Sequence, residues 1–91
     1  MSRAIEHDTA QRRFNWTEDG VLCVLDYLLH DGIMTITHTG VPEAVGGRGI
    51  AADLARAALE AARSNGWSVK PQCSYVAAYI KRHPEYQDLV A

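Results

Sequence analysis

The sequence is poor in cysteine and has no long apolar run. Its two cysteines, Cys23 and Cys73, are far apart and form no CxxC pair and no cluster with histidine. A small secreted domain usually carries more cysteines at paired spacings, so we expect a reducing, cytoplasmic location and no metal site. No apolar stretch approaches the ~20 residues of a membrane span, and the polar N-terminus lacks the apolar core of a signal peptide. We therefore expect no membrane partner.

An excess of positive charge is also missing. Nine lysines and arginines against eleven acidic residues give a net charge of −2, and the pI is near 6.0. Domains that bind nucleic acid usually carry a basic patch and a high pI, so no nucleic-acid partner is expected. The composition that remains is globular, with 47% hydrophobic residues in a chain of 91. This length suits one domain with a single modest core.

The first half of the chain predicts an antiparallel meander. Residues 1–11 are polar and aperiodic, and we expect them to form a flexible arm before a domain over 12–91. Asp19-Gly20 and Asp31-Gly32 are strong signals for tight hairpin turns. They separate segments with the alternation or β-branched content of strands. The three predicted strands cover residues 13–16, 21–29 and 33–39.

The second half predicts two helices around a short strand. An alanine-rich segment over 50–65 has helical periodicity and is followed by Gly66, a common helix stop. A strand is expected over 67–69, and a helix over 75–82 with Ser74 as its N-cap. The fold class is therefore α+β (mixed α/β), in which the meander is followed by helix, strand and helix.

A glycine-rich loop, Gly46-Gly47-Arg48-Gly49, precedes the long helix. The N-terminus of a helix offers unpaired N–H groups and the positive end of the helix dipole, and glycine lets a phosphate approach closely. Arg48 adds a positive charge, so we expect Gly46–Ala51 to bind a pyrophosphate. The Walker and dinucleotide-binding patterns are both absent. The alternative is a connection that merely turns the chain from strand to helix, and the loop alone does not decide between the two.

Four further motifs occur along the chain, His38-Thr39-Gly40-Val41-Pro42, Gly47-Arg48-Gly49-Ile50-Ala51, Pro71-Gln72-Cys73 and His83-Pro84-Glu85-Tyr86. In this order they resemble the GNAT acetyltransferase superfamily, and more closely its short single-domain N-acetyltransferase-like members. The phosphate-loop pattern Gln/Arg-x-x-Gly-x-Gly/Ala is matched at Gly49 and Ala51, and the resemblance runs from about Phe14 to the C-terminus.

The resemblance implies a compact GNAT-like fold that binds acetyl-CoA. The cofactor-binding residues it implies are Val41, Gly46, Gly47, Arg48, Gly49, Ile50 and Ala51. Two positions depart from the family pattern. Gly46 replaces the usual Gln or Arg, which removes one side-chain contact to phosphate. Gly40 replaces the usual Glu of the short family, which removes a carboxylate that can act as a base or bind the amine.

Three residues are candidates for catalysis. The resemblance places the thioester between the ends of the strands that carry His38 and Trp67–Val69, with N–H groups near Val41 facing the carbonyl. Cys73 precedes a helix N-terminus, which lowers a thiol pKa, and is a candidate to accept the acetyl group, with His38 as its base. Tyr79 is a candidate acid. The alternatives are a structural strand histidine, a small buried cysteine and simple aromatic packing.

The function that follows is acetyl transfer from acetyl-CoA to an amine of a protein or small molecule. A rival interpretation is a non-catalytic module that binds acyl-CoA or another protein, which the loss of Glu at Gly40 favours. A third is a structural domain without a ligand. The sequence leaves open the acceptor, the choice between direct attack and an acetyl-cysteine, and the oligomeric state, a monomer or a weak dimer.

Overall fold

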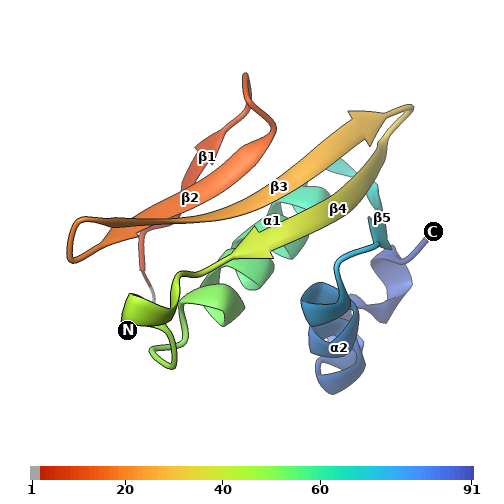
Figure 1. Cartoon of the computed structure of the whole chain (residues 1–91). Coiled ribbons are helices and arrows are strands. Elements are labelled where there is room, and N and C mark those ends of the chain that lie inside the picture. Colours follow the sequence, from red (N-terminus) through yellow and green to blue (C-terminus); the bar gives the residue numbers. More distant parts are fainter. Residues whose placement is uncertain (1–2) are drawn as a thin grey trace.

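A computed structural model describes residues 3–91, and in it a five-stranded sheet carries helices on one face (Figure 1). The strands follow one another across the sheet in chain order, antiparallel except for the last pair, which is parallel. The elements are β1 (Glu6–Asp8), β2 (Arg13–Glu18), β3 (Val21–His30), β4 (Ile33–Gly40), the 3₁₀ helix η1 (Glu43–Val45), α1 (Ile50–Asn65), β5 (Ser68–Pro71), α2 (Ser74–Arg82) and the 3₁₀ helix η2 (Pro84–Leu89).

Both predicted hairpin turns are confirmed. Asp19 and Gly20 join β2 to β3 with φ angles of 50° and 77°, and Asp31 and Gly32 join β3 to β4 with 52° and 76°. Two consecutive residues with positive φ form the tight turn whose twist matches that of the flanking strands. Aspartate tolerates this conformation and glycine favours it, so the two dipeptides fix the registers of the meander.

The N-terminal segment differs from the flexible arm expected over residues 1–11. Residues 1–2 lie outside the described part of the chain, but Glu6–Asp8 forms β1 and pairs with β2. The His7 ring stacks on Phe14 with centroids 4.0 Å apart, and His7 Nε2 shares a 2.6 Å hydrogen bond with Tyr27 Oη. The polar sequence of β1 does not predict a strand, because β1 is held in place by its pairing with β2 and by the contacts of a single side chain, His7.

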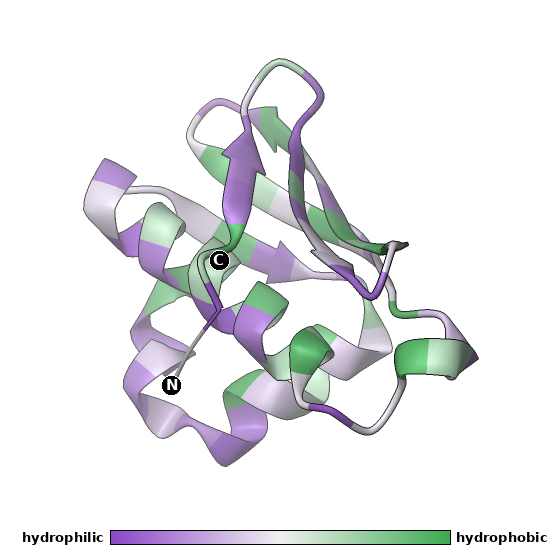
Figure 2. Ribbon diagram, turned by 90° about the vertical axis from the view of Figure 1, so that its left-hand side faces the viewer, coloured by the Kyte–Doolittle hydropathy of each residue, from purple (hydrophilic) through white to green (hydrophobic). Residues whose placement is uncertain are grey.

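The two faces of the sheet differ in polarity. One face is buried against α1 and α2, and side chains such as Leu25, Tyr27, Met34, Ile36 and Leu54 form a single core with both helices. Within residues 3–91 no helix covers the other face, where Leu22, Leu28 and polar side chains are exposed. Figure 2 shows the resulting alternation of hydrophobic and hydrophilic residues along the strands. We call the uncovered side the open face.

The two long helices follow the sequence prediction closely. α1 begins after Gly49 (φ 83°) and ends before Gly66 (φ 71°), both in the left-handed region that glycine favours. α2 differs in its first turn, because Cys73 is the N-cap and the expected cap, Ser74, is already helical. Among residues 3–91 no helix is long and apolar enough to cross a membrane.

Candidate functional site

The glycine loop and the first turn of α1 line a cavity of about 370 Å³, here called the loop cavity. Gly47 and Gly49 have positive φ angles of 76° and 83°, and in the described chain no atom lies within 4 Å of where a side chain would begin at either residue. No side chain of residues 3–91 caps α1, so its first N–H groups are available to a ligand. The lining residues are Val41, Gly46, Gly47, Gly49, Ile50, Ala51, Ala52 and Tyr75.

Next to this loop, β4 and β5 separate. They pair in parallel only from Ile33–Ser68 to Ile36–Pro71, and the last backbone bond between the two segments runs from Cys73 N to Ile36 O (3.0 Å). From Thr37 to Gly40, β4 continues with β3 as its only strand partner in the described chain. This split leaves backbone groups of β4 open to an extended ligand, beside the Val41 end of the loop cavity.

A bulge in β4 decides which side chains face the split. Asp26 pairs with His38 but Tyr27 pairs with Ile36, so Thr37 is an extra residue in β4. Regular alternation from the buried Ile36 would turn His38 toward the helices. The extra residue reverses this alternation, so that Thr39 faces the helix side and His38 projects to the open face.

Cys73 therefore meets Thr39, and the expected pairing of Cys73 with His38 as its base does not form. Cys73 Sγ lies 3.4 Å from Thr39 Oγ1, and the thiol is partly buried. Burial raises the pKa of the Cys73 thiol, but hydrogen bonds from the Thr39 hydroxyl and from N–H groups in the first turn of α2 outweigh it and hold the pKa below its ordinary value. The other cysteine, Cys23, is buried in the core as predicted.

On the open face, His38 lies beside Gly40. A Cβ atom at Gly40 would come within 2.8 Å of His38 Nε2, so the imidazole occupies the space that the glycine leaves. Gly40 also lines a shallow apolar hollow of about 440 Å³ together with Arg13, Leu22, Val24, Val41 and Pro42. Val41 lines both this hollow and the loop cavity, so the two lie on either side of the end of β4.

Arg48 does not have the surroundings that the sequence predicted. Its guanidinium donates to Asp19 (2.7 Å) and to Glu18 (3.2 Å) at the β2–β3 turn, and Arg48 is not among the residues that line the loop cavity. The positive charge expected at the phosphate loop is thus compensated by two carboxylates. Sequence reasoning missed this because the partners come from a distant hairpin.

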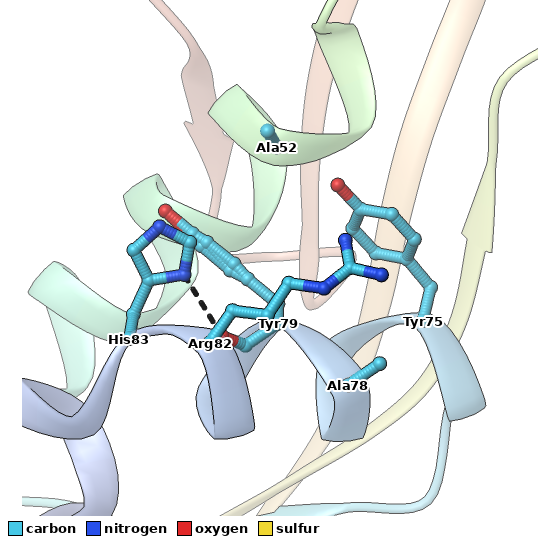
Figure 3. Close-up of a pocket in the computed structure, with 6 residues that line it drawn as sticks. All are labelled: Ala52, Tyr75, Ala78, Tyr79, Arg82 and His83. Carbon is cyan, nitrogen blue, oxygen red and sulfur yellow. Dashed lines mark hydrogen bonds between the residues drawn. The ribbon is translucent and has the colours of Figure 1, made fainter.

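A further cavity of about 220 Å³ lies between the first turn of α1 and one face of α2, and we call it the α1–α2 cavity (Figure 3). Tyr79, the candidate acid, lines this cavity and is nearly buried, with its ring stacked on His83 at 4.0 Å. Burial raises the pKa of Tyr79. Tyr75 is exposed and lines both the α1–α2 cavity and the loop cavity.

Known proteins share this arrangement of sheet, loop and helices. A family model described as GCN5-related N-acetyl-transferase matches residues 13–89, which is most of the chain. The chain belongs to the GCN5-related N-acetyltransferase family. Among residues 3–91 no group of three or more His, Cys, Asp or Glu side chains is arranged to hold a metal ion.

Similarity to individual proteins supports membership of the same family. Protein NATD1 of Homo sapiens is 34% identical over 84 residues, covering 88% of this chain and 74% of the relative. Protein NATD1 of Danio rerio is 30% identical over 92 residues, covering 94% and 83%. The solution structure of a GCN5-like protein from Staphylococcus aureus superposes with a TM-score of 0.75 at 28% identity, covering 96% of this chain and 86% of that one.

Proposed function

We propose that this chain binds acetyl-CoA at the loop cavity and the β4–β5 split, and that it transfers the acetyl group to an amine of a protein or small molecule. The proposal rests on one observation, which is that three structural features lie together at the start of α1 and the end of β4. These are the uncapped start of α1, the glycines with positive φ, and the parallel strands that separate beside them. The first two suit a pyrophosphate, and the third suits an extended chain with amide groups.

The residues of the chain fit this donor. The N–H groups of Ile50, Ala51 and Ala52 would hold the pyrophosphate, with Gly46, Gly47 and Gly49 allowing it to approach. Val41 would border the thioester at the end of β4. When bound, acetyl-CoA would supply an acetyl group on a thioester. The C–S bond to CoA would break as the acetyl group passes to Cys73 or directly to a neutral amine, CoA would leave as the thiol, and the amine would lose a proton as its C–N bond forms.

Cys73 and His38 would act from opposite sides of β4 in this proposal. Cys73 has a thiol with a lowered pKa beside the split, which suits a nucleophile that takes the acetyl group in a first step. His38 faces the side from which an amine crossing the open hollow would arrive, and it would accept the proton of that amine. Direct attack by the amine, with Cys73 only lining the split, is the alternative.

Tyr79 is the weakest of the three proposed catalytic residues. Its hydroxyl belongs to the α1–α2 cavity, and its ring is held between His83 and Tyr86. A proton donated to the leaving thiol would have to cross from that cavity to the split. We therefore propose Cys73 and His38 as the reacting side chains and Tyr79 as support for α2.

The test uses two glycines at the two ends of α1. Gly49→Ala and Gly66→Ala place the same Cβ at residues with φ angles of 83° and 71°, so the backbone strain is matched. Only Gly49 lines the loop cavity. We expect Gly49→Ala to lower kcat/KM for acetyl-CoA by about tenfold or more, whereas Gly66→Ala lowers stability alone by about 1 kcal/mol.

The readout is thiol release from acetyl-CoA with a panel of amines, with CoA binding measured by calorimetry. Equal effects of the two substitutions on kcat/KM would contradict the proposed pyrophosphate site at the glycine loop. Tight CoA binding without turnover on any amine would instead favour the non-catalytic acyl-CoA-binding module. Absence of both binding and turnover in the folded wild-type chain would remove acetyl-CoA from the proposal altogether.

A further inference from the structure

The glycine loop contains a single residue that is not glycine, and that residue is held by other parts of the chain. Between Gly46 and Gly49 this residue is Arg48, while Gly47 and Gly49 adopt positive φ angles of 76° and 83°. Glycine loses more conformational freedom than any other residue when it is fixed in one conformation. A loop of this composition therefore needs contacts with the rest of the chain to keep a single shape.

Arg3 contacts the main chain of this loop. Its guanidinium donates Nη2 to the carbonyl oxygen of Arg48 (3.0 Å) and Nη1 to Asp53 Oδ2 in the first turn of α1 (2.7 Å). Its third nitrogen, Nε, lies 3.4 Å from Glu18 Oε1 at the end of β2. In Figure 1 the segment before β1 runs down to this end of α1. One side chain, only 20% exposed, thus joins the glycine loop, α1 and β2.

The guanidinium of Arg48 is held by the β2–β3 turn. It donates to Asp19 (2.7 Å) and to Glu18 (3.2 Å), and Glu18 also accepts the indole N–H of Trp16 (2.7 Å). Glu18 therefore lies between Arg3 and Arg48 and contacts both. The result is that Arg48 is fixed at its carbonyl by Arg3 and at its side chain by the turn.

The charges of this network balance, which matters beside a site for an anion. Three carboxylates are paired with three guanidiniums, and the residues are Glu18, Asp19, Asp53, Arg3, Arg48 and Arg56. Asp53 in the first turn of α1 is paired both with Arg3 (2.7 Å) and with Arg56 (2.8 Å). Removal of Arg3 would change the charge beside the loop as well as the contact with its carbonyl, so an experiment has to separate these two effects.

An arginine at the other end of α1 makes contacts of the same kind. Arg63, in the last turn of α1, pairs with Asp88 (3.1 Å) and donates to the main-chain carbonyl of Glu85 (2.6 Å). These contacts join α1 to η2 and not to the glycine loop. Arg63→Ala therefore removes a carboxylate pair and a carbonyl contact from the same helix, and it is the matched control for Arg3→Ala.

We infer that Arg3 is a positioning residue that holds the glycine loop in the shape that receives the pyrophosphate. The inference rests on the proposed function for the identity of the ligand. A guanidinium presents five N–H donors in a fixed fork, so Arg3 serves the Arg48 carbonyl and two carboxylates at once, whereas a lysine ammonium is a point charge. The segment before β1 thus belongs to the donor site, although Arg3 lines neither the loop cavity nor the α1–α2 cavity.

The first experiment measures the order of the loop in the chain without ligand. Heteronuclear NOE and relaxation dispersion at the amides of Gly47, Arg48 and Gly49 together cover fast and slow motions. Arg3→Ala should make these amides more mobile, because the Arg48 carbonyl loses its contact. Arg63→Ala should leave them as in the wild-type chain. An equally ordered loop in Arg3→Ala would overturn the inference.

The second experiment compares CoA affinities by calorimetry. Arg3→Ala should weaken CoA by about tenfold, which corresponds to a loop that keeps its binding shape in roughly one chain in ten. Arg3→Lys keeps the charge but not the fork, so its affinity should remain closer to that of Arg3→Ala than to that of the wild-type chain. Arg63→Ala should bind CoA like the wild-type chain. Full affinity in Arg3→Lys would mean that Arg3 acts through its charge alone, which would overturn the positioning role.

The two readouts separate this inference from the proposed function. If the wild-type chain binds CoA but Arg3→Ala fails to loosen the loop or fails to weaken CoA, the inference falls while acetyl-CoA binding stands. If the wild-type chain does not bind CoA, the proposed function falls and the ligand named in this inference falls with it. The comparison of loop order still decides, in that case, whether Arg3 holds the loop.

Discussion

At the level of single residues, the extra residue Thr37 has the largest consequence for the site. Without it, the alternation of β4 would place His38 opposite Cys73, as the sequence suggested. With it, Thr39 contacts Cys73 and His38 faces the open hollow. The extra residue thus places the thiol of Cys73 and the imidazole of His38 on opposite sides of the strand, and in the proposed function each side chain meets a different reactant.

The local environment of Cys73 predicts its reactivity toward alkylating agents. Iodoacetamide should modify Cys73 with a rate that reaches half its maximum at a pH below 9.0, the ordinary pKa of the thiol, because the hydrogen bonds to Cys73 favour the thiolate. Thr39→Val, which keeps the branched shape but removes the hydroxyl, should move this midpoint to higher pH. The measurement is the labelling rate by intact mass across a pH series.

Two comparisons control this prediction within the same chain. Cys23 is fully buried, and burial raises its pKa, so it should stay unlabelled while the protein is folded. His38→Ala should leave the Cys73 midpoint in place, because the imidazole projects to the other face. A clear upward shift in His38→Ala would show that the histidine does reach the thiol and would overturn the assignment of faces.

At the level of elements, the parts that could be predicted carry local signals. Asp-Gly pairs fixed both hairpins, and the glycines before Ile50 and after Asn65 bounded α1. These signals act through the φ angle of one or two residues, which requires no knowledge of the rest of the chain. The glycine loop and its place before α1 were predictable for the same reason.

The features that were missed depend on distant partners. β1 has a polar sequence, and it forms a strand because it pairs with the edge of β2 and because His7 hydrogen-bonds to the Tyr27 hydroxyl. The ion pairs of Arg48 with Glu18 and Asp19 join residues about thirty positions apart in the chain. Near the C-terminus, Val90 forms a parallel bridge with Val69 of β5, and no local sequence pattern predicts this contact. Sequence periodicity contains none of these contacts.

The docking of β1 should depend on pH through His7. Burial lowers the pKa of His7 below its ordinary value of 6.5, so the unfolded chain binds this proton more readily than the folded chain. The stability that neutral His7 contributes is therefore complete above pH 6.5 and is lost as the pH falls from 6.5 through the folded pKa. Urea unfolding at pH 7 and at lower pH should show this loss as a reduced free energy of unfolding.

Substitution of histidines distinguishes His7 from the other titrating groups. His7→Gln should flatten the decline in stability between neutral and acidic pH, because glutamine cannot take up the proton. His30→Gln, at an exposed histidine of the β3–β4 hairpin, should leave the decline in place. An equal decline in wild type and His7→Gln would mean that β1 is not held by a neutral histidine.

At the level of the whole molecule, the site depends on elements from both halves of the chain. β4 forms the split and leads into Val41, the glycine loop and α1 supply the N–H groups, and the start of α2 supplies Tyr75 and its N-cap residue, Cys73. All of them pack on one core on the helix-covered side of the sheet. The open face contributes the hollow beside Gly40 and the His38 imidazole, and in the proposed function the acceptor arrives from this side.

Titration of the ¹⁵N-labelled chain with CoA, followed by the shifts of its backbone amides, tests this arrangement most directly. The largest changes should fall on Gly46–Ala52 and on the first turn of α2, because most residues of the first segment line the loop cavity and the N–H groups of Tyr75 and Val76 lie against Cys73. Amides at the β3–β4 hairpin, such as Gly32, should not respond. No response at Ile50, Ala51 and Ala52 in the presence of saturating CoA, or a response centred on the open face, would contradict the assignment of the loop cavity as the donor site.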